Sequence, residues 1–328
     1  MIVEISEFEK KYSFELRPVT QLCGQNIIIK TYMMESMKKY FSTFKYSEEK
    51  NKWRDNVRVD GQLLGRKHYR VLCVQNSSDL ISMIKWSKQS LMLEYVKILM
   101  QKFDWQCHLN VISDEMDAMF QMLNEDLESL GDIELNYEEA ELWNIIQKSS
   151  VTGINGEVLE DKSGDELMLI FLNLIEQILS VSPEKILVII ENPDHYLSIS
   201  QYRKLVERMQ KMSSHFDLYF INLISLDGYA VCQEELCPGI AIFNEVPFQM
   251  PEMEELLQAI NDNYPCNKSF TEKDMQELME SIIQKIGKAD YLNTVEENVI
   301  CKIINQSLLL NDRWEKLENM PEISFLRA

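Results

Sequence analysis

Apolar residues in this chain fall into short β-rich runs that alternate with longer segments of helical period. The runs rich in Ile, Val, Leu and Phe are NIII, YRVLCV, KILVIIE, DLYFINLI and GIAIF. Such runs favour strands, whereas the segments between them carry apolar residues every three or four positions, as amphipathic helices do. The alternation predicts an α/β fold with a largely parallel sheet that is covered on both faces.

Residues 77–150 break this alternation and predict a helical insertion. Apolar residues recur there at spacings of three and four, namely Met116, Met119, Phe120, Leu123, Leu127 and Leu130. The polar face of the same segment is acidic. Its apolar stripe must therefore pack either on the rest of the chain or on another subunit.

These patterns divide the chain into three parts. We expect an α/β head formed by residues 1–76 and 151–245, a helical leg insertion at 77–150, and a C-terminal helical extension at 246–328. The extension contains amphipathic helical patterns, and Thr271 and Asp274 have the spacing of a capping box at the start of one of them.

Composition indicates an ordered globular protein in a reducing compartment. The chain has 328 residues, of which 45% are hydrophobic, enough to bury a large core. Its seven cysteines form no CxxC pair, so we expect reduced and mostly buried thiols rather than disulfides or a zinc site. The acidic start does not resemble a signal peptide, and the longest apolar runs are too short to span a membrane. We expect a cytoplasmic protein with no membrane partner.

The formal net charge is -20, which by itself argues against a polyanionic partner, but the charges are distributed unevenly along the chain. Residues 1–70 contain 14 Lys and Arg and 9 Asp and Glu, a net charge of +5, so residues 71–328 carry a net charge of -25. We call residues 1–70 the basic island. One face of the molecule should repel nucleic acid while another attracts it.

The segment QLCGQNIIIKTYMMESMKKYF follows a predicted strand and leads into a predicted helix, where strand–loop–helix ATPases bind phosphate. It keeps part of the phosphate-loop skeleton, namely Gly24, Asn26, Lys30 and Thr31. Residues 27–29 are isoleucines where such a loop has glycine, and β-branched residues resist the required left-handed backbone at about 1–2 kcal/mol each. We expect a collapsed loop or a continued strand.

A second motif, KILVIIENPDHYLS, resembles the strand of ATP-binding-cassette (ABC) and structural-maintenance (SMC) ATPases that ends in a metal-binding Asp and a catalytic Glu. Glu191 and Asn192 stand at those two positions, and an amide cannot act as a general base. Gln75 ends the run YRVLCVQ like a glutamine-loop residue, and Ser163 precedes a long helix like a signature serine. No histidine follows DLYFINLIS, where these enzymes have a switch histidine.

Four degenerate elements follow one another in the chain order of an ATPase. They indicate a degenerate P-loop, ABC/SMC-like head that no longer binds ATP. The alternative is that Lys30 and Thr31 still hold a phosphate weakly.

Together with the acidic segment IELNYEEAELWNII, these motifs resemble the accessory adaptation protein of type II-A CRISPR loci, in its long form. The resemblance covers about residues 1–230. It implies a homotetrameric ring that binds the ends of double-stranded DNA in a central hole during spacer acquisition, without ATP hydrolysis. It also implies the CRISPR integrase complex and the type II effector nuclease as partners.

The same resemblance implies a structural calcium ion near the junction of head and leg. The acidic cluster consists of Glu134, Asn136, Glu138 and Glu139, oxygen-bearing side chains of the kind that calcium prefers. Asn136 stands where a short-form member has a carboxylate, which lowers the charge of the site. The alternative is a solvated acidic helix start.

The DNA-binding role implied by the resemblance agrees with the basic island. Side chains that only neutralise phosphates need no fixed order. The candidate DNA-binding residues are Lys38, Lys39, Lys45, Lys50, Lys52, Arg54, Arg58, Arg66, Lys67 and Arg70. The alternative is that they are ordinary solvated charges.

Two other classes of function remain open at this point. One is an active ATPase of the recombination or chromosome-maintenance type, which would need glycines at residues 27–29 and a carboxylate at Asn192. The other is a protein scaffold of the CRISPR adaptation complex in which the basic island has no role.

Overall fold

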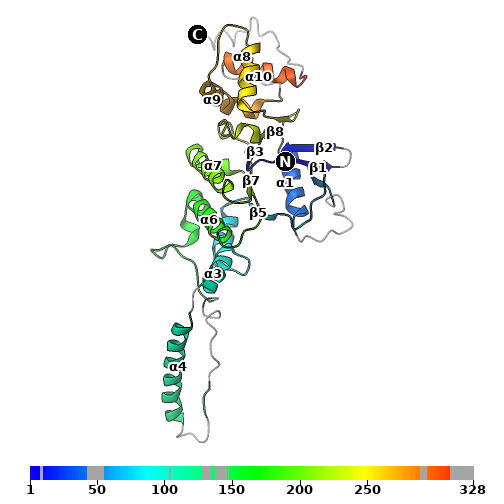
Figure 1. Ribbon diagram of the computed structural model, residues 1–328. Coiled ribbons are helices and arrows are strands. Elements are labelled where there is room, and N and C mark those ends of the chain that lie inside the picture. Colours follow the sequence, from blue (N-terminus) through cyan, green and yellow to red (C-terminus); the bar gives the residue numbers. More distant parts are fainter. Residues whose placement is uncertain are drawn as a thin grey trace. The chain divides into compact units, whose positions relative to one another are not determined.

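The computed structural model describes residues 1–7, 10–42, 55–102, 105–127, 134–136, 146, 148–288 and 294–310. Two compact units make up the chain, and both are drawn in Figure 1. The first unit consists of residues 1–75 and 184–328, and the second unit of residues 76–183.

A six-stranded sheet forms the centre of the first unit. Its strand order is β5-β6-β7-β3-β8-β9, in which the first five strands run parallel and β9 is antiparallel to β8. The strands are β5 (Arg70–Val74), β6 (Ile186–Glu191), β7 (Leu218–Leu223), β3 (Val19–Cys23), β8 (Ile240–Ile242) and β9 (Phe248–Gln249). The prediction of a mixed α/β fold is confirmed, and four of the five β-rich runs lie in these strands.

The fifth run, NIII, is not a strand, and that prediction was wrong. Ile27 begins helix α1 (Ile27–Tyr40). Strand β3 ends at Cys23, and Gly24 then takes φ +90°, which breaks the extended backbone. The side chain of Asn26 accepts a hydrogen bond from the N–H of Ile29 at 3.2 Å, so a helix cap overrides the β propensity of the isoleucines.

A second, three-stranded antiparallel sheet was not predicted from the sequence. It has the order β2-β1-β4, formed by β1 (Ile2–Glu7), β2 (Lys10–Glu15) and β4 (Val57–Val59). Helix α1 joins the two sheets in one core, because its buried Met33 and Met37 share a hydrophobic cluster with Val3 of β1 and Leu22 of β3.

Helix α7 (Ile199–Ser213) packs on β3 and β7. It reaches β3 through Tyr202, whose hydroxyl donates to Oε1 of Gln21 at 3.3 Å. Successive side chains of a strand point to opposite faces, so Gln21 and Leu22 lie on opposite faces of β3. The six-stranded sheet is therefore covered by α1 on one face and by α7 on the other. Short 3-10 helices, η4 (Pro193–His195) and η5 (Cys237–Gly239), complete the region.

The C-terminal extension belongs to the first unit. It contains α8 (Met253–Asn263), α9 (Glu272–Ile282), the 3-10 helix η6 (Ile283–Lys285) and α10 (Val295–Ser307), which lie next to one another in Figure 1. The predicted capping box is confirmed: the N–H of Thr271 donates to Oδ2 of Asp274 at 2.9 Å, and the N–H of Asp274 donates to Oγ1 of Thr271 at 3.3 Å.

The second unit is helical. Its elements are α2 (Ser77–Ile84), α3 (Leu91–Lys102), α4 (Gln106–Leu127), the 3-10 helix η3 (Leu159–Asp161) and α6 (Gly164–Leu179). Helices α2, α3 and α6 pack together. Helix α4 carries the predicted apolar stripe, and Met119 and Leu123 of that stripe are exposed in this chain. Leu130 lies outside the described residues.

The state of the thiols agrees with the expectation of reduced and mostly buried cysteines. All seven cysteines are free, and four of them, Cys23, Cys232, Cys237 and Cys301, are buried. Among the residues that the structure describes, no helix is both long and apolar enough to cross a membrane.

Candidate functional site

The predicted motif residues of the first unit gather at the carboxyl edge of the six-stranded sheet. Gly24 follows β3, Gln75 follows β5, and Glu191 is the last residue of β6. Nε2 of Gln75 donates to Oε1 of Glu191 at 2.9 Å, so two of the motifs are in contact. This edge is where open α/β sheets bind their ligands.

The turn between β3 and α1, residues 24–26, is closed by hydrogen bonds; we call it the glycine turn. The Gly24 N–H donates to Oε1 of Gln284 at 2.6 Å, the Gln25 N–H to Oδ1 of Asn244 at 2.7 Å, and the Asn26 N–H to the carbonyl of Phe243 at 3.0 Å. Phosphate loops bind their ligand with such N–H groups. Here three successive donors are already used within the protein.

Only glycine fits at position 24. Its φ of +90° is in the left-handed region, and a Cβ atom built there would lie 2.3 Å from the carbonyl oxygen of Phe243. The backbone of the glycine turn is therefore pressed against the end of β8. This close approach accounts for the glycine without any ligand.

The three isoleucines form the first turn of α1. Ile28 is 84% exposed, so a large apolar side chain faces solvent in the first turn of this helix, where a phosphate-binding loop would have glycine. Thr31 is also exposed, on α1. Both alternatives for the isoleucines, a collapsed loop and a continued strand, were wrong: residues 27–29 are helical, and only residues 24–26 form a closed turn.

Lys30 does not face the glycine turn. It is 2% exposed, and its Nζ donates to the carbonyl of Ile224 at 2.8 Å and to Oγ of Ser225 at 3.0 Å, at the end of β7. Burial lowers the pKa of this ammonium group, while Cys23 and Asp194 partly oppose the shift. The lysine of the phosphate motif thus ties α1 to β7.

Asp194, on η4, supplies a buried carboxylate to the same region. Its Oδ2 accepts hydrogen bonds from the N–H groups of Ser225 at 2.8 Å and Leu226 at 2.7 Å, whereas its buried Oδ1 has no hydrogen-bond partner. The carboxylate fixes the loop after β7, and Lys30 binds the same loop. Sequence reasoning missed Asp194, although it lies only two residues after Asn192.

Asn192 and Ser163 have local structural roles. Asn192 adopts φ 50° and ψ 50°, a left-handed conformation that asparagine tolerates better than most residues, and its N–H donates to the carbonyl of Leu223 at 3.1 Å. Ser163, in the second unit, is the N-cap of α6 and forms a capping box with Glu166. These contacts hold Glu166 in its charged form and lower its pKa. Helix capping alone explains the serine.

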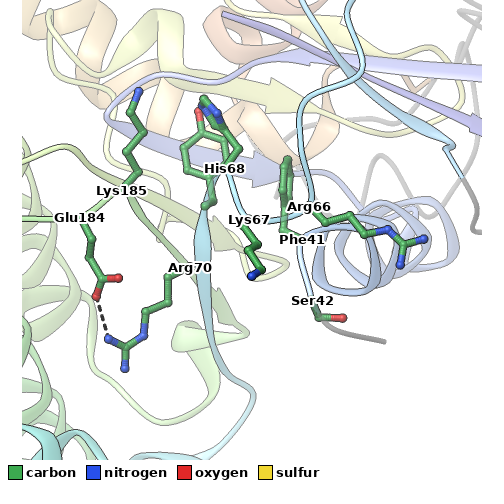
Figure 2. Close-up of a pocket in the computed structure, with 9 residues that line it drawn as sticks. Phe41, Ser42, Arg66, Lys67, His68, Arg70, Glu184 and Lys185 are labelled. Carbon is green, nitrogen blue, oxygen red and sulfur yellow. Dashed lines mark hydrogen bonds and ion pairs between the residues drawn. The ribbon is translucent and has the colours of Figure 1, made fainter. Parts of the chain in front are cut away.

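A second feature of the first unit is a cavity of about 400 Å³, which we call the basic pocket and show in Figure 2. It brings together three of the predicted DNA-binding residues, Arg66, Lys67 and Arg70. The other lining residues are Phe41, Ser42, His68, Tyr69, Glu184 and Lys185. Four of the nine are Lys or Arg and one is an acid.

Two cations of the basic pocket are held by carboxylates. Nη1 of Arg70 donates to Oε1 of Glu184 at 2.7 Å, and Nζ of Lys185 lies 3.2 Å from Oδ2 of Asp217. Figure 2 shows Arg66 extending away from the Arg70–Glu184 pair. Sequence reasoning missed Lys185, because it lies far outside the basic island of residues 1–70. Its position just before strand β6, next to the first residue of β5, could have indicated it.

Three other predicted DNA-binding residues that the structure describes do not line the basic pocket. Lys38 and Lys39, on α1, lie 3.7 and 2.8 Å from the carboxylate oxygens of Glu35. Arg58, on β4, donates to the carbonyl of Gly61 at 3.1 Å. The remaining candidates, Lys45, Lys50, Lys52 and Arg54, lie outside the described residues.

Half of the predicted calcium ligands are described. Glu134 and Asn136 are exposed, and the residue between them, Leu135, exchanges two hydrogen bonds with the side chain of Asn124, at 2.8 and 3.0 Å. Glu138 and Glu139 lie outside the described residues. Calcium needs about 6–8 oxygens, so the two exposed side chains do not by themselves fit the ion. The described part of the chain contains no group of three acidic, His or Cys side chains that could hold a metal.

Comparisons with known proteins agree on one family and one fold. Residues 6–325 match the family model described as CRISPR-associated protein Csn2, subfamily St. The crystal structure of Stu0660 of Streptococcus thermophilus is similar to this chain, with a TM-score of 0.85 and 21% identity over 100% of this chain and 99% of that one. At that identity, the likeness shows a shared fold. No curated protein matches the chain.

Replacing Lys30 tests whether this lysine has a structural role. We expect Lys30→Met to lower the free energy of unfolding by about 1–3 kcal/mol, because the buried acceptors lose their donor and the Asp194 carboxylate loses its nearby cation. Urea unfolding measures the change. Lys38→Met, on the exposed face of the same helix, is the control and should stay within about 0.5 kcal/mol of wild type. If the two variants are equally stable, Lys30 does not have this structural role.

Proposed function

Because the chain belongs to the Csn2 family of type II-A CRISPR-associated proteins, which takes part in adaptation, we propose that it binds the ends of double-stranded DNA during spacer acquisition. We further propose that four copies form a ring whose central hole holds the DNA. The CRISPR integrase complex and the type II effector nuclease are then its partners. No ATP is hydrolysed in this role.

The basic pocket is the observation that carries the DNA-binding proposal. In a chain of net charge -20, it concentrates Arg66, Lys67, Arg70 and Lys185 around one cavity. Lys and Arg that neutralise phosphates account for most sequence-independent affinity for DNA. A strongly acidic protein can approach a duplex only where its cations converge, and a symmetric ring repeats such a surface in every subunit.

The glycine turn and Lys30 support a role without ATP. The three N–H groups of the turn are used by protein oxygens, and the ammonium group of Lys30 binds the end of β7. Asn192 offers no carboxylate that could activate water. We infer that the head is a degenerate P-loop domain. Titration calorimetry with Mg-ATP should detect no micromolar binding, and binding that is lost in Lys30→Met would favour the active-ATPase alternative.

DNA topology tests the proposed encirclement, because a duplex can enter a closed ring only through an end. The same plasmid is compared in a gel-shift experiment as a relaxed closed circle and after linearisation, at moderate salt. We expect the linear form to bind far more tightly, and its affinity to fall steeply as salt rises. Equal retention of the two forms would refute encirclement.

Neutralising the basic pocket should weaken DNA binding without a change in sequence preference. In Arg66→Gln with Lys67→Gln, the slope of log affinity against log salt should become shallower by about 0.9 for each phosphate that the variant no longer neutralises. Lys204→Gln with Lys273→Gln removes the same charge from α7 and α9, outside the pocket, and is the matched control. If the control pair weakens binding equally, net charge rather than the pocket determines affinity.

We also propose that a calcium ion stabilises the leg through Glu134, Asn136, Glu138 and Glu139. Binding to the folded state alone raises its stability by about 2.7 kcal/mol at a hundredfold excess over Kd. Adding calcium should therefore raise the Tm in thermal unfolding, and a chelator should reverse the change. Glu138→Ala should remove the response, whereas Glu115→Ala, an exposed acid on α4, should keep it. If the Tm does not change when calcium is added, the site is excluded.

A further inference from the structure

The C-terminal extension reaches the glycine turn through a buried glutamine. Gln284 lies in η6 and is 0% exposed. Its Oε1 accepts the 2.6 Å hydrogen bond from the Gly24 N–H, and its Nε2 donates to the carbonyl of Leu226 at 3.4 Å. One side chain of the extension thus contacts both the glycine turn and the loop after β7.

A second amide, that of Asn244, links the glycine turn to the same part of the extension. Its Oδ1 accepts the 2.7 Å hydrogen bond from the Gln25 N–H. Its Nδ2 donates to the carbonyls of Gln284 at 2.9 Å and Ile286 at 2.6 Å. Asn244 is buried, so the turn, the segment after β8 and η6 share one closed hydrogen-bond network.

The chain after η6 is fixed against the same segment. Gly287 adopts φ +81°, and a Cβ there would lie 2.5 Å from the carbonyl oxygen of Val246. Its N–H donates to Oδ1 of Asn305, on α10, at 2.9 Å. Nζ of Lys288 donates to Oε1 of Gln25 at 2.6 Å, which adds a side-chain contact to the glycine turn. The extension is therefore docked on the turn by several independent contacts.

We propose that the C-terminal extension is a built-in plug of the glycine turn. The amide oxygen of Gln284 takes one N–H donor that an anion would otherwise bind. The amide of Asn244, which the extension holds through the carbonyls of Gln284 and Ile286, takes a second donor, and both keep the turn closed. At the glycine turn a neutral amide oxygen is a better acceptor than a carboxylate. The lysine of the phosphate-loop motif, Lys30, points to the carbonyl of Ile224 and would not balance a buried negative charge at the turn. Gln284 is a positioning residue that acts through the turn.

The plug has a consequence for helix α1. The glycine turn sets where α1 begins, and α1 carries Lys38 and Lys39 in its last turn. A change in the extension should therefore be transmitted to the start of this helix. An extension that moved as an independent arm would leave the turn unchanged.

Hydrogen–deuterium exchange of the full chain, read on peptides that cover residues 22–27, tests the plug. Gln284→Met keeps the length of the side chain but removes the acceptor oxygen. We expect exchange in these peptides to become at least about tenfold faster, since a buried N–H loses its partner. The matched control is Gln249→Met: Oε1 of Gln249 accepts from the Glu15 N–H at 3.0 Å and makes no contact with the turn.

The outcomes separate the plug from a general loss of stability. Faster exchange at residues 22–27 in Gln284→Met, with wild-type exchange there in Gln249→Met, supports the proposal. Unchanged exchange in Gln284→Met, or equal opening of the turn in the control, overturns it. If Gln284→Met does not fold, Asn244→Ala repeats the test, because it frees the Gln25 N–H and removes the two hydrogen bonds that link Asn244 to Gln284 and Ile286 of the extension.

Discussion

The first unit depends on one requirement: the backbone N–H groups of the turn after β3 must have acceptors, above all the buried N–H of Gly24. A buried donor without an acceptor costs about 1–3 kcal/mol, so the Gly24 N–H is a constraint that the fold must satisfy. A nucleotide-binding protein satisfies it with phosphate oxygens. This chain satisfies it with Gln284, Asn244 and the carbonyl of Phe243. Helix α1, which joins the two sheets, begins at the position that these bonds define.

Once the turn is closed in this way, the other residues of the motif take structural roles. Lys30 is buried and binds the loop after β7, the loop that the Asp194 carboxylate also holds. Burial raises the pKa of the neighbouring Cys23 thiol to about 12, so this thiol stays neutral. The part of the carboxyl edge around Cys23, Lys30 and Asp194 is thus packed and buried, and the three backbone N–H groups of the glycine turn are all used within the protein.

Sequence patterns predicted the elements whose signal is local. The runs in β5, β6, β7 and β8 are rich in apolar residues, and the capping box joins Thr271 to Asp274, only three positions further along the chain. The three-stranded sheet was missed because KKYSFE is rich in charged and polar residues. Burial of Lys30 could not be predicted either, since its acceptor, the carbonyl of Ile224, lies 194 residues away in sequence. The plug spans 260 residues, from Gly24 to Gln284.

The proposed binding of DNA at the basic pocket requires that cations which already have carboxylate partners can also bind phosphate. The Arg70–Glu184 and Lys185–Asp217 pairs are partly exposed, and such pairs contribute only about 0–1 kcal/mol. A DNA phosphate can therefore compete with the carboxylate for the guanidinium or ammonium group. Glu184 meanwhile keeps Arg70 oriented and lowers the repulsion among the neighbouring cations. The carboxylates thus make a dense cationic pocket stable in the absence of DNA, and the excess of four cations over one lining acid leaves its net charge positive.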